Sequence, residues 1–176
     1  MSIADQVQQN LGDAEIQQIA NQLGVDPTQA RTAIDSAMPM LLAGMANTAQ
    51  QTGGADAIQQ AATSHAGLLD NLGAMFGNAG FGDSGGLLGK ILGQHTSTVQ
   101  SGVEQHSGLD SNQTRRLLMI LAPMVLAMLA KRRQASPSPQ PIDTDLRDEA
   151  QRAQTKAPHV GGILGKILSH VETPRQ

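Results

Sequence analysis

Two stretches of this chain, residues 24–46 and 108–133, repeat one pattern at a spacing of 84 positions, and this recurrence leaves few folds open. Each stretch opens with glycine, an apolar residue and aspartate, and then runs into an apolar segment that contains a proline. The matching pairs are Asp26 with Asp110, Gln29 with Gln113, Arg31 with Arg115, Pro39 with Pro123, Met40 with Met124 and Leu42 with Leu126. We interpret the pattern as an internal duplication of a capped, buried helix that kinks or restarts at its proline.

Both stretches carry a strong signal for the start of a helix. Asp26 and Asp110 stand where an N-cap side chain accepts a hydrogen bond from the first turn, and Gln29 stands three positions later, as in a capping box. Pro27 occupies the first helical position, where its missing N–H does no harm. We therefore expect Asp26 and Asp110 to cap the two duplicated helices.

The composition favours an all-α fold. Aromatic residues make up 1% of the chain, so the core has to come from Leu, Ile, Val, Met and Ala, most of which are good helix formers. Near the N-terminus, Ile3, Val7 and Leu11 recur every fourth residue, which is typical of the apolar face of a helix. The sequence predicts a compact multi-helical domain over residues 1–133, with a glycine-rich loop at about 73–86.

The segment after this domain has a different character. Residues 134–160 are rich in Pro, Ser, Gln and charge, and we interpret them as a disordered linker with no more than a short helix at 143–154. Residues 161–172 then form a short amphipathic C-terminal segment. On this reading, residues 1–133 should fold without anything that follows them.

A short apolar segment occurs twice. "GGLLGKIL" occupies residues 85–92 and "GGILGKIL" occupies residues 161–168, and seven of the eight letters agree. On a helix, Lys90 and Lys166 would lie opposite one apolar face. That face consists of Leu87, Leu88, Ile91 and Leu92 in the first copy and of Ile163, Leu164, Ile167 and Leu168 in the second. We expect the second copy to dock in a site like the one that receives the first, in its own chain or in another. The alternative is that both are low-complexity Gly/Leu sequences with no shared site.

These residues resemble a known family. The segments "LGVDPTQARTAIDSAMPMLLAGMA" and "SGLDSNQTRRLLMILAPMVLAMLAK", together with the glycine-rich middle, are similar to the YidB-like bacterial proteins, domain of unknown function 937. The resemblance covers about residues 10–133. It implies an all-helical fold with a buried central helix, and it implies no reaction.

Nothing in the sequence points to an enzyme, a cofactor or a metal. The nucleophile elbow and the phosphate-binding loop are both missing, and the chain has no cysteine. The spacing of His95 and His106 would hold them about 16 Å apart on one helix, which is too far to share a metal ion. We interpret all five histidines as solvent-facing or loop residues: His65, His95, His106, His159 and His170.

Two alternatives to a protein-contact role remain open. Residues 14–37 have the shape of a helix-turn-helix, but residues 27–36 offer only Arg31 as a cation and the net charge is −3, so DNA is an unfavoured partner. The apolar run 117–130 is shorter than the roughly 20 residues that span a membrane, although basic residues flank it on both sides. We interpret it as a buried core helix, with membrane contact through this run or through the tail as the alternative.

The leading hypothesis is a non-enzymatic protein that acts through protein contact, with self-association into a homo-oligomer as its most direct form. No signal peptide is visible at the N-terminus, so we expect a cytoplasmic protein. Because cations are unfavourable at a helix N-terminus, we also expect acidic partners for Arg115 and Arg116, with Asp110 the nearest in sequence.

Overall fold

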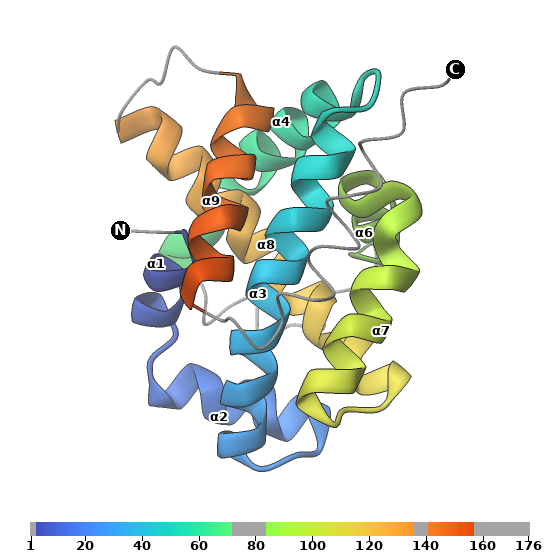
Figure 1. Cartoon of the computed structure of the whole chain (residues 1–176). Coiled ribbons are helices and arrows are strands. Elements are labelled where there is room, and N and C mark those ends of the chain that lie inside the picture. Colours follow the sequence, from blue (N-terminus) through green and yellow to red (C-terminus); the bar gives the residue numbers. More distant parts are fainter. Residues whose placement is uncertain (1–2, 72–83, 136–140, 157–176) are drawn as a thin grey trace, which may run out of the picture.

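The computed structural model describes residues 3–71, 84–135 and 141–156, and all the regular structure in those ranges is helical (Figure 1). The all-α prediction is therefore confirmed. The α-helices are α1 (Ile3–Asn10), α2 (Asp13–Leu23), α3 (Pro27–Ala49), α4 (Gly54–His65), α6 (Ser84–Leu92), α7 (Thr96–Ser107), α8 (Ser111–Ala135) and α9 (Ile142–Lys156). Two short 3-10 segments, η1 (Ala66–Asn71) and η2 (Gly93–His95), join them.

The central element is α3, which runs through the middle of the molecule (Figure 1). All residues from Ser36 to Ala49 are buried. In Figure 1, α9 lies along one side of α3, and α6 and α7 lie along the other. A helix that is covered all round has to be apolar all round, and this explains why residues 37–46 carry no charged side chain.

The second long helix, α8, is also a core element. Its residues from Leu117 to Ala130 are buried, apart from the half-buried Met119. α1, α4, α6 and α7 all pack against it. The interpretation of residues 117–130 as a buried helix is confirmed.

The two long helices begin alike. Gly24 and Gly108 precede them in the left-handed conformation, with φ of 73° and 69°. The Asp26 carboxylate accepts a hydrogen bond from the Gln29 N–H at 2.9 Å, and the Asp110 carboxylate accepts one from the Gln113 N–H at 2.8 Å. Both predicted caps are thus confirmed, and both helices continue through their prolines as single elements. The common origin of the two stretches by duplication stays a prediction.

The first turns of α8 bind the end of α2. Arg116 donates a hydrogen bond to the Gln22 carbonyl at 3.3 Å, and the Gln113 side-chain amide donates one to the Leu23 carbonyl at 3.0 Å. The expectation of an acidic partner is wrong for Arg116. The last carbonyls of a helix carry partial negative charge and have no partner within the helix, so they accept from a cation as a carboxylate would.

The largest departure from the sequence prediction is α9. Residues 142–156 form a helix, which agrees with the short helix allowed at 143–154, but this helix packs into the core, so the interpretation of the segment as a disordered linker is wrong for this part. Ile142, Leu146, Ala150 and Ala153 are buried, and α9 packs mainly on α3. Residues 84–86 of the expected glycine-rich loop belong to α6, while residues 72–83, the connections 136–140 and 157–160, and the tail 161–172 lie outside the described residues.

Candidate functional site

The first copy of the repeated segment is part of the core. It forms α6, in which Leu88, Ile91 and Leu92 are at most 2% exposed and Leu87 is half-buried, while Lys90 is exposed. α6 packs against α3, α4 and α8. The predicted apolar face therefore exists, and its own domain covers most of it.

The contact of α6 with α3 depends on a glycine. A Cβ atom added at Gly44 would lie 2.6 Å from Leu92 Cδ2 and 3.0 Å from Val99 Cγ2. Only a residue without a side chain lets α6 and α7 approach α3 this closely. The role of Gly44 was not predicted from the sequence, since a lone glycine in an apolar run has no pattern that shows what lies against it.

The second copy, Ile163, Leu164, Ile167 and Leu168, lies outside the described residues, but the structure limits where it starts. Because α9 extends to Lys156, only residues 157–160 separate it from Gly161. Five Cα–Cα steps of at most about 3.6 Å allow the tail to begin no more than about 18 Å from the end of α9. Chain length therefore limits only where the tail can begin, and the site that the first copy fills is already occupied by α6 itself.

A buried carboxylate joins α9 to the rest of the domain. Glu149 is 1% exposed and accepts hydrogen bonds from the Ile3 N–H at 2.5 Å, from Arg132 at 2.5 Å and from Arg152 at 3.2 Å. One turn earlier, Asp145 pairs with Arg133 at 2.9 Å. The buried carboxylate of Glu149 is tolerated in the core because it accepts hydrogen bonds from these three donors, two of which are cationic. It fixes α1, α8 and α9 relative to one another.

Sequence reasoning missed this cluster. It took the acidic run at 143–149 for a solvated linker, whereas Asp145 and Glu149 face the two arginines at the end of α8. The available signal was the spacing of Ile142, Leu146, Ala150 and Ala153, which places all four on one helix face. Two of the four are alanines, which made the stripe easy to overlook.

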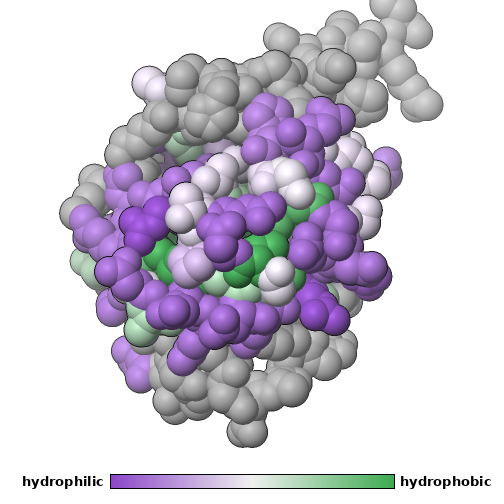
Figure 2. Space-filling view, turned by 90° about the horizontal axis from the view of Figure 1, so that it is seen from below, coloured by the Kyte–Doolittle hydropathy of each residue, from purple (hydrophilic) through white to green (hydrophobic). Residues whose placement is uncertain are grey.

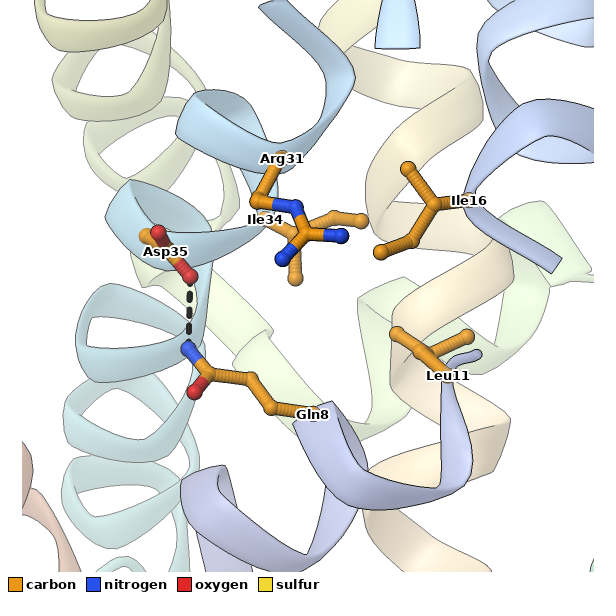
Figure 3. Close-up of a pocket in the computed structure, with 6 residues that line it drawn as sticks. All are labelled: Gln8, Leu11, Ile16, Arg31, Ile34 and Asp35. Atoms are coloured by element: carbon orange, nitrogen blue, oxygen red, sulfur yellow. Dashed lines mark hydrogen bonds between the residues drawn. The ribbon is translucent and has the colours of Figure 1, made fainter. Parts of the chain in front are cut away.

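A small pocket lies where α1, α2 and α3 meet (Figure 3). Its volume is about 110 Å³, below the roughly 300 Å³ of the smallest usual ligand sites. Figure 3 shows Gln8 reaching Asp35 across it, and the Gln8 amide donates to the Asp35 carboxylate at 2.5 Å. Its other lining residues are Leu11, Ile16, Arg31 and Ile34. A second hollow of about 300 Å³ lies between α4, α8 and the start of α9.

The helix-turn-helix candidate, residues 14–37, lies at the lower end of the molecule in α2 and the first turns of α3 (Figure 1). Seen from below, hydrophilic side chains surround a small apolar area at this end (Figure 2). The one cation of residues 27–36, Arg31, pairs with Asp13 at 2.8 Å, and its side chain is 58% exposed. A cation already bound to a carboxylate is poorly placed to attract a phosphate.

By length and composition alone, α8 could span a membrane. In the structure, however, 78% of its most apolar 18-residue window is buried inside the protein. A core helix of a globular domain has the same composition as a spanning helix, and burial by other helices is the property that separates them.

Two of the three histidines that the structure describes contact their own helix, and the third, His95, is half-buried at the end of η2. His65 Nδ1 lies 2.7 Å from the Ala61 carbonyl, and His106 Nδ1 lies 3.0 Å from the Gly102 carbonyl, each one turn back on its own helix. Both side chains are half-buried, so for these two the solvent-facing interpretation holds only in part. Across residues 3–71, 84–135 and 141–156, no three side chains of the metal-binding types come together. His159 and His170 lie outside the described residues.

Together these features define an all-helical domain built around two long, proline-containing core helices. The chain belongs to a family described as bacterial proteins of unknown function, DUF937, because the model of that family matches residues 5–132. The suspected resemblance is therefore confirmed, and α9 lies beyond the matched segment. No curated protein and no solved structure matches the chain.

Proposed function

We propose that this protein is not an enzyme and that it acts through protein contact, joining copies of itself through the tail segment 161–168. The proposal is supported most by the burial of α6, the segment that matches the tail in sequence. With seven of eight residues the same, α6 buries Leu88, Ile91 and Leu92 against helices of its own domain. A segment with the same apolar face has the same tendency to leave water for a helical groove.

The short connection to α9 adds a second argument. Residues 157–160 are a tether of only four residues, so once one tail has docked on a neighbouring copy, docking of the second tail in the same pair is intramolecular and needs only a weak intrinsic affinity. In addition, the site of α6 is filled in every chain by α6 itself. A docked tail therefore needs another groove, either on its own chain or on a second one.

The test is the mass of the protein in solution. Light scattering over a range of concentrations should show the parent forming a species larger than one chain. The Leu164→Asp and Leu168→Asp double variant should remain a single chain, because two buried carboxylates would have no partner. Lys166→Asp with Ser169→Asp is the matched control, since by helical spacing it adds two carboxylates to the opposite side of the segment.

Two results would contradict the proposal. One is a parent that has the mass of a single chain at every concentration. The other is a double variant that associates as the parent does. Flotation with anionic phosphatidylglycerol vesicles adds a third arm, because a monomeric parent that floats, and loses this property in the double variant, would assign the tail to the membrane surface instead.

A further inference from the structure

We propose that the groove now filled by α1 is the binding site for the tail segment 161–168, so that α1 and the tail compete for it. This inference rests on the proposed function only in taking the tail as the contact element. It makes a separate statement, namely which surface of the domain receives the tail.

The short helices at the two ends of the repeat exchange partners. α6 packs on α3, the long helix of the N-terminal half, and also on α4 and α8, whereas α1 packs on α8, the long helix of the C-terminal half. The helices that follow α3 and α8 in the chain show the same exchange, because α4 packs mainly on α8 and α9 packs mainly on α3. The groove of α1 is therefore the counterpart of the groove of α6, and the tail carries the sequence of α6.

The tail also matches α1 in register. The spacing of 84 positions that aligns Asp26 with Asp110 also aligns Ile3 with Leu87 and Val7 with Ile91. Ile3, Val7 and Ile91 are all fully buried, and Leu87 is half-buried. In the tail, Ile163 and Ile167 stand at the same two positions. The tail can thus present branched apolar side chains where α1 presents Ile3 and Val7.

α1 has few large apolar side chains with which to hold its groove. It has only eight residues, and Ile3, Val7 and the following Leu11 are the large apolar side chains it places in the core. Isolated helices of this length do not persist in water, so α1 depends on its groove. The tail offers four large apolar residues within six positions, at Ile163, Leu164, Ile167 and Leu168.

The connection between α9 and the tail is long enough to reach the groove of α1. The Ile3 N–H donates a hydrogen bond to Glu149, so the start of α1 lies beside α9. Glu149 is seven residues before Lys156, the last residue of α9. Seven helical residues extend about 10 Å. The connection 157–160 can extend about 18 Å, so the tail of the same chain reaches the start of this groove, and the tail of a neighbouring copy can enter it as well.

The experiment uses a labelled synthetic peptide of residues 159–172 and measures its binding by fluorescence anisotropy. The host is the full chain with Leu164→Asp and Leu168→Asp, so that its own tail does not compete. Val7→Asp is added to detach α1, and Gln9→Asp is the matched control, because it places the same charge on an exposed position of α1. The peptide should bind the Val7→Asp host at least tenfold more tightly than the Gln9→Asp host.

Equal affinity for the two hosts would overturn the inference, and so would equal binding of a scrambled peptide. A second measurement needs no destabilising change in α1. When the peptide is added to the host without Val7→Asp, the amide resonances of residues 3–10 should move to disordered positions while those of α6 stay in place. Displacement of another helix with α1 unchanged would also overturn it.

The two proposals fail separately. If the peptide binds the groove but the parent has the mass of one chain, the groove is assigned correctly and the tail docks within its own chain, so that self-association is wrong. If the parent associates through its tail but the peptide ignores the loss of α1, self-association stands and the groove is wrong.

Discussion

At the scale of single residues, Glu149 is the polar group on which the position of α9 depends. Glu149→Ala removes the acceptor for the Ile3 N–H and for Arg132, and it leaves the buried Ile3 N–H without a partner. The side chains of Arg132 and Arg152, which both bind Glu149, are 37% and 56% exposed, so water can replace much of their contact with the carboxylate. We predict a loss of about 1–3 kcal/mol of unfolding free energy, measured by urea titration followed by circular dichroism.

The control for Glu149 is its neighbour Asp148, which is exposed. Asp148→Ala removes a carboxylate from the same helix and should change the unfolding free energy by less than about 0.5 kcal/mol. If both variants unfold at the same urea concentration, the buried cluster does not stabilise the domain.

Two glycines make a matched pair for testing how closely the helices pack. Gly44 in α3 would place a Cβ 2.6 Å from Leu92 Cδ2, whereas Gly89 in α6 has no atom within 4 Å of its Cβ position. An alanine in a helix interior gains about 0.5–1 kcal/mol over glycine, and overpacking a core costs about 1–3 kcal/mol. Gly89→Ala should therefore raise the melting temperature, and Gly44→Ala should lower it. Two shifts of the same sign would mean that α6 does not lie on α3 as described.

At the scale of whole elements, α9 is as much a part of the core as the helices within the family match. Leu146 is fully buried and its neighbour Arg147 is exposed. Leu146→Asp should reduce the unfolding free energy by several kcal/mol, because it buries a charge without a partner, whereas Arg147→Asp should have little effect. Hydrogen exchange should show lower protection along α3 in the first variant only.

A chain that ends after Arg133 tests the same helix by its absence. The sequence led us to expect that residues 1–133 would fold alone with little loss. The packing of α9 on α3 leads us to predict the opposite, since removal of α9 uncovers apolar surface of α3. The shortened chain should melt well below the parent or aggregate. A loss of only a few degrees would show that α9 adds little to stability.

These elements also show what a sequence can and cannot reveal. The caps at Asp26 and Asp110 and the buried run 117–130 were predictable, because caps and long apolar runs are local signals. The docking of α9 was not predictable, because it depends on ion pairs between residues that are distant in the sequence. Arg132 pairs with Glu149, and Arg133 pairs with Asp145. The closeness of α6 to Gly44 was equally invisible, since it is a property of the tertiary packing.

At the scale of the whole molecule, the position of α8 decides between a globular protein and one that enters a membrane. Leu121 is fully buried in the middle of α8, and Gln134 is exposed near its end. If α8 is a core helix, Leu121→Asp places an unpartnered charge at the centre of the domain and should unfold it, at a cost of several kcal/mol. Gln134→Asp should leave the fold intact.

The measurement combines fractionation with circular dichroism. A core role for α8 predicts that the parent and Gln134→Asp are soluble and helical, and that Leu121→Asp has lost most of its helical signal or its solubility. A spanning role predicts the reverse order, with the parent in the membrane fraction and Leu121→Asp released from it while still helical. The burial of α8 by α1, α4, α6 and α7 favours the first outcome, because helices that already cover the apolar run leave little of it for lipid.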